Sequence, residues 1–293
     1  MAKSCAIVVR VFDGEAPYLQ SFIDHHRSIG IDQFYPVIAP RGAPLCREIL
    51  SRNQLGFTEV EGQKIGAVRG LIKEDYVAVI DADEYLHPDL LPFIQEEAFQ
   101  SLAMPWRMTA TLSDSGFESG LKRFFDFPQI KSVMRTRSLT GLGLHRSGTR
   151  GRGRCLGLSE GLAFPIHHYY LRGLDDLMLK EGGVVKRTLA QSTGRKSVAL
   201  GEGSTAHQLA AFPSRHARVA FLLRVLDHLP EQKDPYAVST DQVMLNRLRE
   251  QMSVDLNSVK AELRQSINSI YGVFRTRSIH NQIKDIEKIL ADK

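Results

Sequence analysis

Two aspartates stand immediately after an apolar, β-branched run, and their spacing suits the binding of a divalent cation. Asp81 and Asp83 follow residues 76–80 (YVAVI), which have the composition of a buried strand. Ligands of open parallel sheets bind beyond the carboxyl ends of the strands. Residues two apart on an extended chain point the same way, so both carboxylates can face one Mg²⁺ or Mn²⁺, or one cation and a ribose hydroxyl. Such a cation would stabilise the charge of a departing nucleoside diphosphate.

The same Asp-x-Asp segment has two other interpretations. Aspartate favours helix caps and exposed turns, so the pair could be purely structural. An apolar strand followed by Asp-x-Asp also resembles the nucleophile motif of haloacid-dehalogenase-like phosphatases. That motif characteristically lies on the first strand and continues with Thr or Val, whereas several expected strands precede Asp81 and Glu84-Tyr85 follows it.

Charged residues in other segments offer acid–base chemistry and anion binding. Asp114 and Glu118 lie in a loop, TLSDSGFESG, where either carboxylate could take a proton from a sugar hydroxyl, although an ordinary acidic loop explains them equally well. Lys64 and Arg69 lie on an expected helix before the Asp81 strand, where they could reach a nucleotide or simply be solvated. Four arginines alternate with glycines in a segment that could cover an anionic donor, bind a phosphorylated acceptor or form an exposed loop. They are Arg146, Arg150, Arg152 and Arg154.

Alternating strands and helices must position these residues in the first half of the chain. Strands are expected at residues 5–11, 34–39, 57–60 and 76–80, and helices at residues 15–29 and 63–73, with Gly30 ending the first helix. This alternation predicts a mainly parallel α/β sheet. After Leu102 the pattern is less regular, and the glycine- and arginine-rich residues 141–157 are expected to form loops.

The carboxyl-terminal part has helical spacing at residues 205–229 and 255–290. An apolar stripe from Leu256 to Ile270, continued from Ile279 to Leu290, could pack on the body of the protein or form a coiled-coil dimer. A single irregular stripe is weak evidence for a sustained heptad, so packing on the body is favoured.

Composition places the chain among ordinary globular proteins. Of its 293 residues, 43% are hydrophobic and 24% are charged. No apolar run approaches the roughly 18 residues that span a bilayer, and no secretory signal is evident, so a soluble cytoplasmic protein is expected. Three widely spaced cysteines favour a reduced protein without disulfides. A net charge of +5 favours nucleotide diphosphates, phosphorylated glycans or a peripheral membrane contact, and no nucleic-acid partner is expected.

Four segments between residues 5 and 183 together resemble glycosyltransferases of the family-2 and family-92 type, which adopt the nucleotide-diphospho-sugar transferase fold called GT-A. They are VVRVFDGEAPYLQSFIDHHRSIGID, VAVIDADEYLHP, the pair MPWRM and IKSVMR, and IHHYYLRGLDDLMLKEGG, which carries Lys180. Their order and spacing are more specific than any single motif. In many relatives the second strand ends in Asp residues that help to bind the nucleotide, whereas this chain has VIAPR. The resemblance therefore does not identify the nucleotide of the donor.

The resemblance implies roles for several residues. It makes His168 the histidine that completes the metal or diphosphate shell, with His167 one position away as the alternative and a partly buried structural histidine as the blander interpretation. It places nucleotide contacts at Arg10 and Asp13 and also at Glu15, which could instead cap its own helix. It further puts Lys131 and His145 on the active-site side of the later sheet, Lys131 as a diphosphate partner, and Trp106 beside the acceptor or in the core.

The sequence therefore predicts an α/β, GT-A-type mixed sheet over residues 1–183 and an α-helical region over residues 184–293 that packs on it or mediates oligomerisation. The expected activity is a metal-dependent hexosyl- or deoxyhexosyltransferase of polysaccharide biosynthesis, inverting in the favoured interpretation. It would use Mn²⁺ or Mg²⁺, a nucleotide-sugar donor and a glycan or glycolipid acceptor. The alternatives are a phosphatase or nucleotidyltransferase using the same Asp pair, or a non-catalytic glycan-binding protein on a transferase fold.

Overall fold

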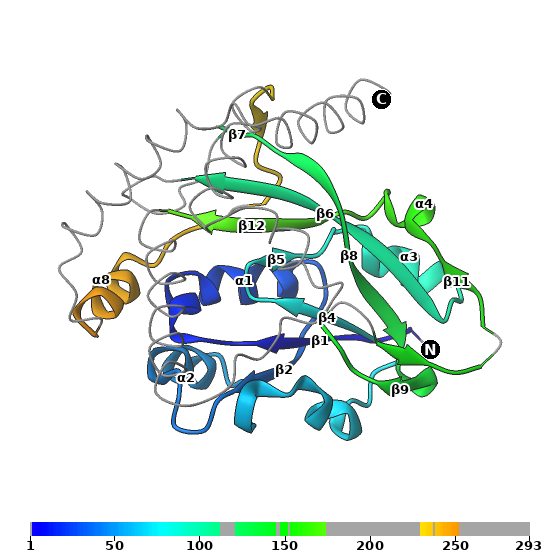
Figure 1. Ribbon diagram of the computed structural model, residues 1–293, viewed down its shortest axis with the longest axis horizontal. Coiled ribbons are helices and arrows are strands. Elements are labelled where there is room, and N and C mark those ends of the chain that lie inside the picture. Colours follow the sequence, from blue (N-terminus) through cyan, green and yellow to red (C-terminus); the bar gives the residue numbers. More distant parts are fainter. Residues whose placement is uncertain are drawn as a thin grey trace, which may run out of the picture.

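The computed structural model describes residues 2–111, 121–144, 147–151, 153–173, 229–236 and 238–251 (Figure 1). Its first half is a parallel sheet, as the alternation of strands and helices predicts. Strand β1 (Cys5–Arg10) lies between β2 (Gln33–Ile38) and β4 (Tyr76–Asp81), and β3 (Thr58–Glu59) extends the edge beside β2. The carboxyl ends of β1 and β4 therefore lie side by side, with Arg10 in register with Asp81.

Helices connect these strands. The segment after β1 forms a short 3-10 turn, η1 (Asp13–Glu15), and then α1 (Ala16–Ser28). Gly30 follows α1 with φ +87°, a conformation in which glycine is favoured, and it ends the helix as expected. After β2, the helix α2 (Pro44–Arg52) returns the chain toward β3.

The second half of the sheet is mixed. Strand β8 (Phe125–Arg135) is antiparallel to both β4 and β6 (Ser101–Thr111), and β12 (Ile166–Arg172) is parallel to β6. The two-residue strand β5 (Glu84–Tyr85) pairs antiparallel with β12. Within the described residues the nine-stranded sheet runs β3-β2-β1-β4-β8-β6-β12-β5, with β11 (Cys155–Leu156) beside β6, so the mixed α/β sheet expected from the sequence is confirmed.

Short elements complete the described part of the chain. Two-stranded ladders form between β7 (Leu121–Lys122) and β13 (Gln232–Lys233), and between β9 (Leu139–Gly141) and β10 (Gly148–Thr149). The remaining elements are η2 (Glu61–Gln63), η3 (Ile65–Leu71), α3 (Leu90–Glu96), η4 (Thr136–Ser138), α4 (Leu158–Gly161) and α8 (Gln242–Gln251).

Two local expectations are wrong. The helix expected at residues 63–73 is instead the pair of 3-10 segments η2 and η3. Glycines at positions 62, 66 and 70 weaken a regular helix, and Ile65 and Val68 are buried at the three-residue spacing that a 3-10 helix places on one face. The described part of residues 141–157, expected to be loops, contains β10 and β11.

The core lies on both faces of the sheet. Alternate residues of β1 belong to different clusters: Ile7 and Val9 pack with α1 and α2, whereas Ala6 and Val8 pack with η3. This two-sided burial is typical of parallel strands and explains why β1 is apolar almost throughout rather than alternating.

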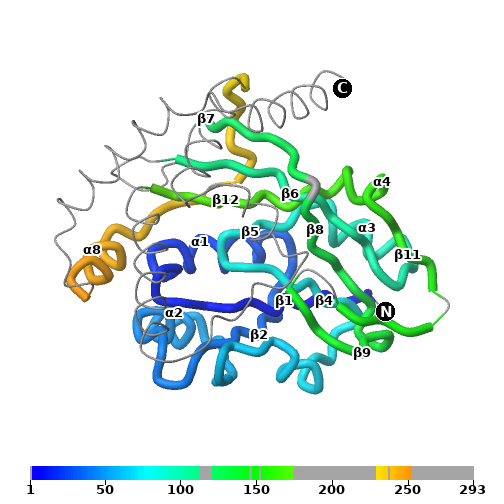
Figure 2. Tube along the Cα trace, in the orientation of Figure 1, coloured from blue at the N-terminus to red at the C-terminus, as the bar shows by residue number. Residues whose placement is uncertain are grey.

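Residues 229–236 and 238–251 pack on the body of the protein although they are remote from it in sequence. Helix α8 lies beside α1 (Figure 2), and the backbone N–H of Asp241 donates to the Pro17 carbonyl at 2.7 Å. The expected domain boundary between residues 183 and 184 and the helices expected at residues 205–229 and 255–290, apart from Leu229, lie outside the described residues. The three cysteines are free. In the described part of the chain, no helix is long and apolar enough to cross a membrane.

Candidate functional site

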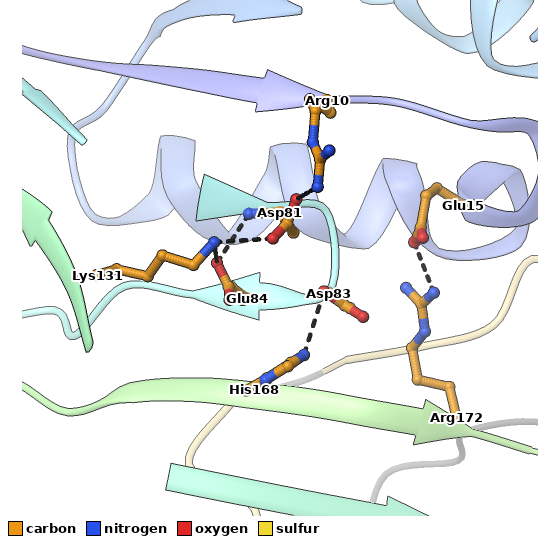
Figure 3. Close-up of polar contacts among 8 residues, drawn as sticks. All are labelled: Arg10, Glu15, Asp81, Asp83, Glu84, Lys131, His168 and Arg172. Atoms are coloured by element: carbon orange, nitrogen blue, oxygen red, sulfur yellow. Dashed lines mark hydrogen bonds and ion pairs between the residues drawn. The ribbon is translucent and has the colours of Figure 1, made fainter. Parts of the chain in front are cut away.

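Charged side chains gather where β1 and β4 end (Figure 3). Arg10 is the last residue of β1 and Asp81 the last of β4, and strand register places them side by side. Arg10 Nη2 donates to Asp81 Oδ1 at 3.0 Å, and each side chain is a little over a quarter exposed. Two residues that were predicted to bind the donor thus form one partly accessible ion pair.

Lys131 enters the same cluster from β8. Its Nζ donates to Asp81 Oδ2 at 2.8 Å and lies 3.1 Å from Glu84 Oε2. The backbone N–H of Asp81 also donates to Glu84 Oε2 at 2.8 Å. The side chains of Lys131 and Glu84 are both fully buried, so this ammonium group is a buried counter-charge shared by two carboxylates.

Burial and charge act against each other in this cluster. Burial would raise the pKa of Asp81, but the Lys131 ammonium and the Arg10 guanidinium outweigh it, and the pKa lies below its usual value. For Glu84 burial dominates, and despite the attraction of Lys131 it raises the pKa to about 7. Burial would lower the pKa of Lys131, yet Glu84 and Asp81 together raise it. Asp81 and Lys131 are therefore held in their charged forms.

Asp83 and His168 form a second pair beside this cluster. Asp83 Oδ1 lies 3.5 Å from His168 Nε2, and the backbone N–H of Tyr169 donates to the Asp83 carbonyl at 2.8 Å. The His168 ring packs against Trp106, with 4.3 Å between ring centroids. Strand β12 thus positions the imidazole against the two-residue turn, residues 82 and 83, that separates β4 from β5.

The neighbouring His167 points to the other face of β12. Its ring lies 4.6 Å from that of Tyr236 and 5.2 Å from that of Phe124. Burial, aided by Arg107, lowers the pKa of His167 to about 3, so the ring is neutral. Of the two candidate histidines, His168 is the one that lies beside Asp83.

A divalent cation needs several donor atoms, which the predicted ligands supply only in part. The predicted set of Asp81, Asp83 and His168 does not assemble as a three-ligand group, and no group of three or more His, Cys, Asp or Glu side chains suited to a metal occurs among the described residues. Both Asp81 oxygens are taken by cationic groups. Asp83 and His168 supply one carboxylate and one imidazole, which would suit Mn²⁺ better than Mg²⁺, with substrate phosphates and water as the other ligands.

Other predicted donor contacts have structural partners. The Asp13 carboxylate accepts the Leu45 N–H at 3.1 Å at the start of α2, and burial, only partly offset by such contacts, raises its pKa. Lys64 is exposed just before η3, and the Arg69 guanidinium donates to the Thr140 carbonyl. Their roles in donor binding stay predictions.

Two acidic residues have partners that the sequence did not indicate: Glu84, which is fully buried, and Glu15, which is partly exposed. Glu84 gives little sequence signal beyond its position three residues after Asp81. Glu15, considered as a nucleotide contact or helix cap, is instead 2.5 Å from the fully buried guanidinium of Arg172 on β12 (Figure 3). That guanidinium also lies over the Tyr18 ring, 3.8 Å from its centroid. The pair joins β12 to the turn before α1.

The arginine-rich segment does not cover the Asp81 cluster in its described part. The Arg150 N–H donates to the Ser138 carbonyl, and Arg154 precedes β11, which pairs with the start of β6. These residues lie at the amino end of β4, because β8 is antiparallel to β4 and its last residue, Arg135, is in register with Tyr76. The remaining predicted residues lie outside the described part of the chain: Asp114, Glu118, His145, Arg146, Arg152 and Lys180.

No protein-family model matches the chain, and no curated protein sequence does. A solved structure of S. aureus TarS 1–349 matches 75% of this chain and 70% of that chain, with TM-score 0.38 and 14% identity. In the complex of the same fragment with UDP-GlcNAc the match covers 45% of each chain, less than half of the TarS length, with TM-score 0.31 and 13% identity. A 4-diphosphocytidyl-2C-methyl-D-erythritol synthase matches 47% of this chain and 77% of that chain, with TM-score 0.29 and 17% identity. These similarities are too distant to assign an activity.

Proposed function

We propose that this chain is a GT-A-type glycosyltransferase of the cytoplasm, which transfers a hexosyl or deoxyhexosyl group from a nucleotide-diphosphate sugar to a glycan or glycolipid acceptor. The observation that carries the proposal is the pairing of Asp83 with His168 beside the Arg10–Asp81 ion pair, at the carboxyl ends of parallel strands. Ligands of such sheets bind at this edge.

Asp83 and His168 would hold Mn²⁺ or Mg²⁺, with oxygens of the donor diphosphate and water in the other positions. When bound, the ion supplies positive charge that stabilises the departing nucleoside diphosphate. Asp81 and Asp83 thus have different roles in this proposal. Asp83 faces the ion, whereas Asp81 orients Arg10, whose guanidinium is partly exposed and suits a diphosphate oxygen.

Lys131 acts as a positioning residue. Its side chain is fully buried and its ammonium is engaged by Asp81 and Glu84, so it does not extend to a ligand outside the cluster. By fixing the Asp81 carboxylate it also fixes Arg10. This role differs from the direct diphosphate contact that the family resemblance implies.

Transfer requires the acceptor hydroxyl to attack the anomeric carbon while a base takes its proton and the nucleoside diphosphate leaves. Asp114 and Glu118 are the predicted bases for an inverting reaction. Trp106 packs against His168 and is only 4% exposed, so it supports the imidazole from the core and offers no free surface to an acceptor.

The test is sugar transfer and donor hydrolysis with Mn²⁺ across UDP-, GDP- and dTDP-sugars, comparing the wild-type protein with Asp83→Asn. Loss of a metal ligand is expected to lower kcat/KM by about 100-fold or more, because metal stabilisation of the leaving group contributes several kcal/mol. Asp89→Asn is the matched control, since the Asp89 side chain is 77% exposed and remote from the cluster's contacts. Equal activity of the Asp83 variant and wild type would remove Asp83 from the site.

The products separate the alternative activities. Pyrophosphate released from a nucleoside triphosphate would indicate a nucleotidyltransferase, and phosphate released from simple phosphomonoesters a phosphatase. Metal-dependent nucleotide binding without turnover of any donor would indicate a non-catalytic binding protein.

A further inference from the structure

A second charged site lies at the opposite end of the sheet. An open pocket of about 230 Å³ is formed there by Gln100, Arg135, Arg137, Ser138 and Arg154, together with Phe99 and small neighbouring residues. Arg135 is in register with Tyr76 at the start of β4, whereas Asp81 ends that strand. At a rise of about 3.3 Å per residue, the two ends of β4 are about 16 Å apart. The pocket is therefore separate from the proposed donor site.

Gln100, which is 5% exposed, holds the walls of this pocket together. Its N–H donates to the Arg154 carbonyl at 2.7 Å, and its carbonyl accepts the Arg135 N–H at 2.9 Å. Its side-chain Oε1 accepts the Gly153 N–H at 2.9 Å. A Cβ at Gly153 would lie only 2.8 Å from Gln100 Cβ, so the close approach requires glycine. Gly153 thus brings the chain next to Gln100, directly before Arg154.

The lining of the pocket has an excess of positive charge. Three arginines line the pocket, and two carboxylates lie near them. Arg154 lies 3.5 Å from Glu97, while Arg135 and Arg137 form no ion pair with the described residues. The Arg154–Glu97 pair is exposed on both sides, 61% and 47%, so water screens it. Asp75 lies within electrostatic reach of Arg135, but its carboxylate accepts the N–H and hydroxyl of Ser4.

The pocket is small for a nucleotide sugar or an oligosaccharide. Its volume lies below the ~300–1,000 Å³ of most sites for drug-sized ligands. Guanidinium groups match the oxygens of a phosphate group in geometry and charge. Arg135 and Arg137, which form no ion pair with the described residues, leave donors for it. The Ser138 hydroxyl adds a further donor at the same wall.

We propose that this pocket binds a single phosphate group, either free or as part of a lipid headgroup, at a second site independent of the donor site. Phosphate binding at this pocket does not depend on the proposed glycosyltransferase activity.

The test measures binding of inorganic phosphate to the full chain by ³¹P NMR, and co-sedimentation with phosphatidylcholine vesicles that contain phosphatidylglycerol. In each assay the wild type is compared with Arg137→Gln, and with Arg52→Gln, which removes the same charge from an exposed site on α2. Arg137 is exposed, so its replacement should leave the fold intact, which the melting temperature would verify. The loss of one charge-assisted contact should weaken binding about tenfold in Arg137→Gln only.

The two assays distinguish the source of the phosphate. Loss of phosphate binding in Arg137→Gln supports a free anion, and loss of vesicle binding alone supports a lipid headgroup. The proposal is overturned if the wild type binds neither, or if Arg137→Gln and Arg52→Gln behave alike.

Discussion

The two faces of strand β12 differ sharply although their residues alternate along the same chain. On one face, His168 lies beside Asp83 and Glu84 is paired with Lys131, so the side chains are held by charge. On the other face, His167 packs against Tyr236, and Tyr85 packs against Tyr169 at 5.0 Å between ring centroids. Neighbouring β5 repeats the division, since Tyr85 is in register with His167 and Glu84 with His168.

Successive side chains of a strand point to opposite faces of the sheet, so neighbouring residues can have different chemical environments. A shift of register by one residue would move each histidine to the other environment. On the face that carries His167 and Tyr169, called here the aromatic face, a neutral ring is required, because burial makes protonation of the imidazole unfavourable. On the face that carries His168, called here the charged face, an imidazole beside a carboxylate can contribute to ion binding. We therefore expect substitutions on the charged face to change ligand binding, and those on the aromatic face to change stability alone.

The largest predicted effect concerns Lys131, whose role on the charged face is also structural. Lys131→Met leaves Asp81 and Glu84 without their shared counter-charge, and the free energy of unfolding should fall by about 3–5 kcal/mol. Chemical denaturation measures this change in the free energy of unfolding. The exposed control Lys73→Met should change stability by no more than about 0.5 kcal/mol. Equal stability of both variants would mean that the buried cluster is not stabilised by Lys131.

On the aromatic face the main polar contact is a single hydrogen bond. Tyr169 Oη donates to Asp234 Oδ1 at 2.6 Å and so ties β12 to the segment before α8. Tyr169→Phe should lower the free energy of unfolding by about 1.5–3 kcal/mol, since the acceptor is a carboxylate. Nucleotide binding should be unchanged. Tyr35→Phe is the control, since it removes a less buried hydroxyl that donates to Glu74. If it lowers the free energy of unfolding as much as Tyr169→Phe does, the Tyr169–Asp234 hydrogen bond has no special role in stability.

A pH dependence should also come from the aromatic side, through His26. This ring is fully buried; it accepts the Leu86 N–H, and Nδ1 lies 2.8 Å from the Phe22 carbonyl. Burial, with a contribution from nearby His25, lowers the pKa of His26 well below 6.5, so the folded state favours the neutral ring. Its contribution to stability is present above pH 6.5 and is lost as pH falls below that value.

The corresponding slope is about 1.4 kcal/mol per pH unit for one histidine. His25, whose pKa is also lowered chiefly by burial, adds to the slope in the wild type. Denaturation between pH 5 and pH 7 should therefore show a shallower dependence for His26→Gln than for the wild type. Identical slopes would show that His26 does not titrate on unfolding in this range.

The parts of this arrangement that were predictable from sequence are those encoded by neighbouring residues. The run before Asp81 predicts a buried strand, and Gly30 predicts the end of α1, because local composition determines both. The buried position of Lys131 depends on a partner 50 residues away, and that of Arg172 on one 157 residues away. Alternation separates His167 from His168, but only the pairing of β12 with β5 determines which one meets Asp83.

The proposed metal and nucleotide site is tested by calorimetric titration of nucleoside diphosphates (UDP, GDP, dTDP and CDP) with and without Mn²⁺, using wild type, His168→Gln and His167→Gln. At least one nucleotide should bind the wild type in a Mn²⁺-dependent manner. His168→Gln should weaken that binding by at least about tenfold, since even outer partners of metal ligands contribute 10–100-fold. His167→Gln should bind like the wild type. Absence of Mn²⁺-dependent binding, or equal weakening by both substitutions, would contradict the assignment of the site to the charged face.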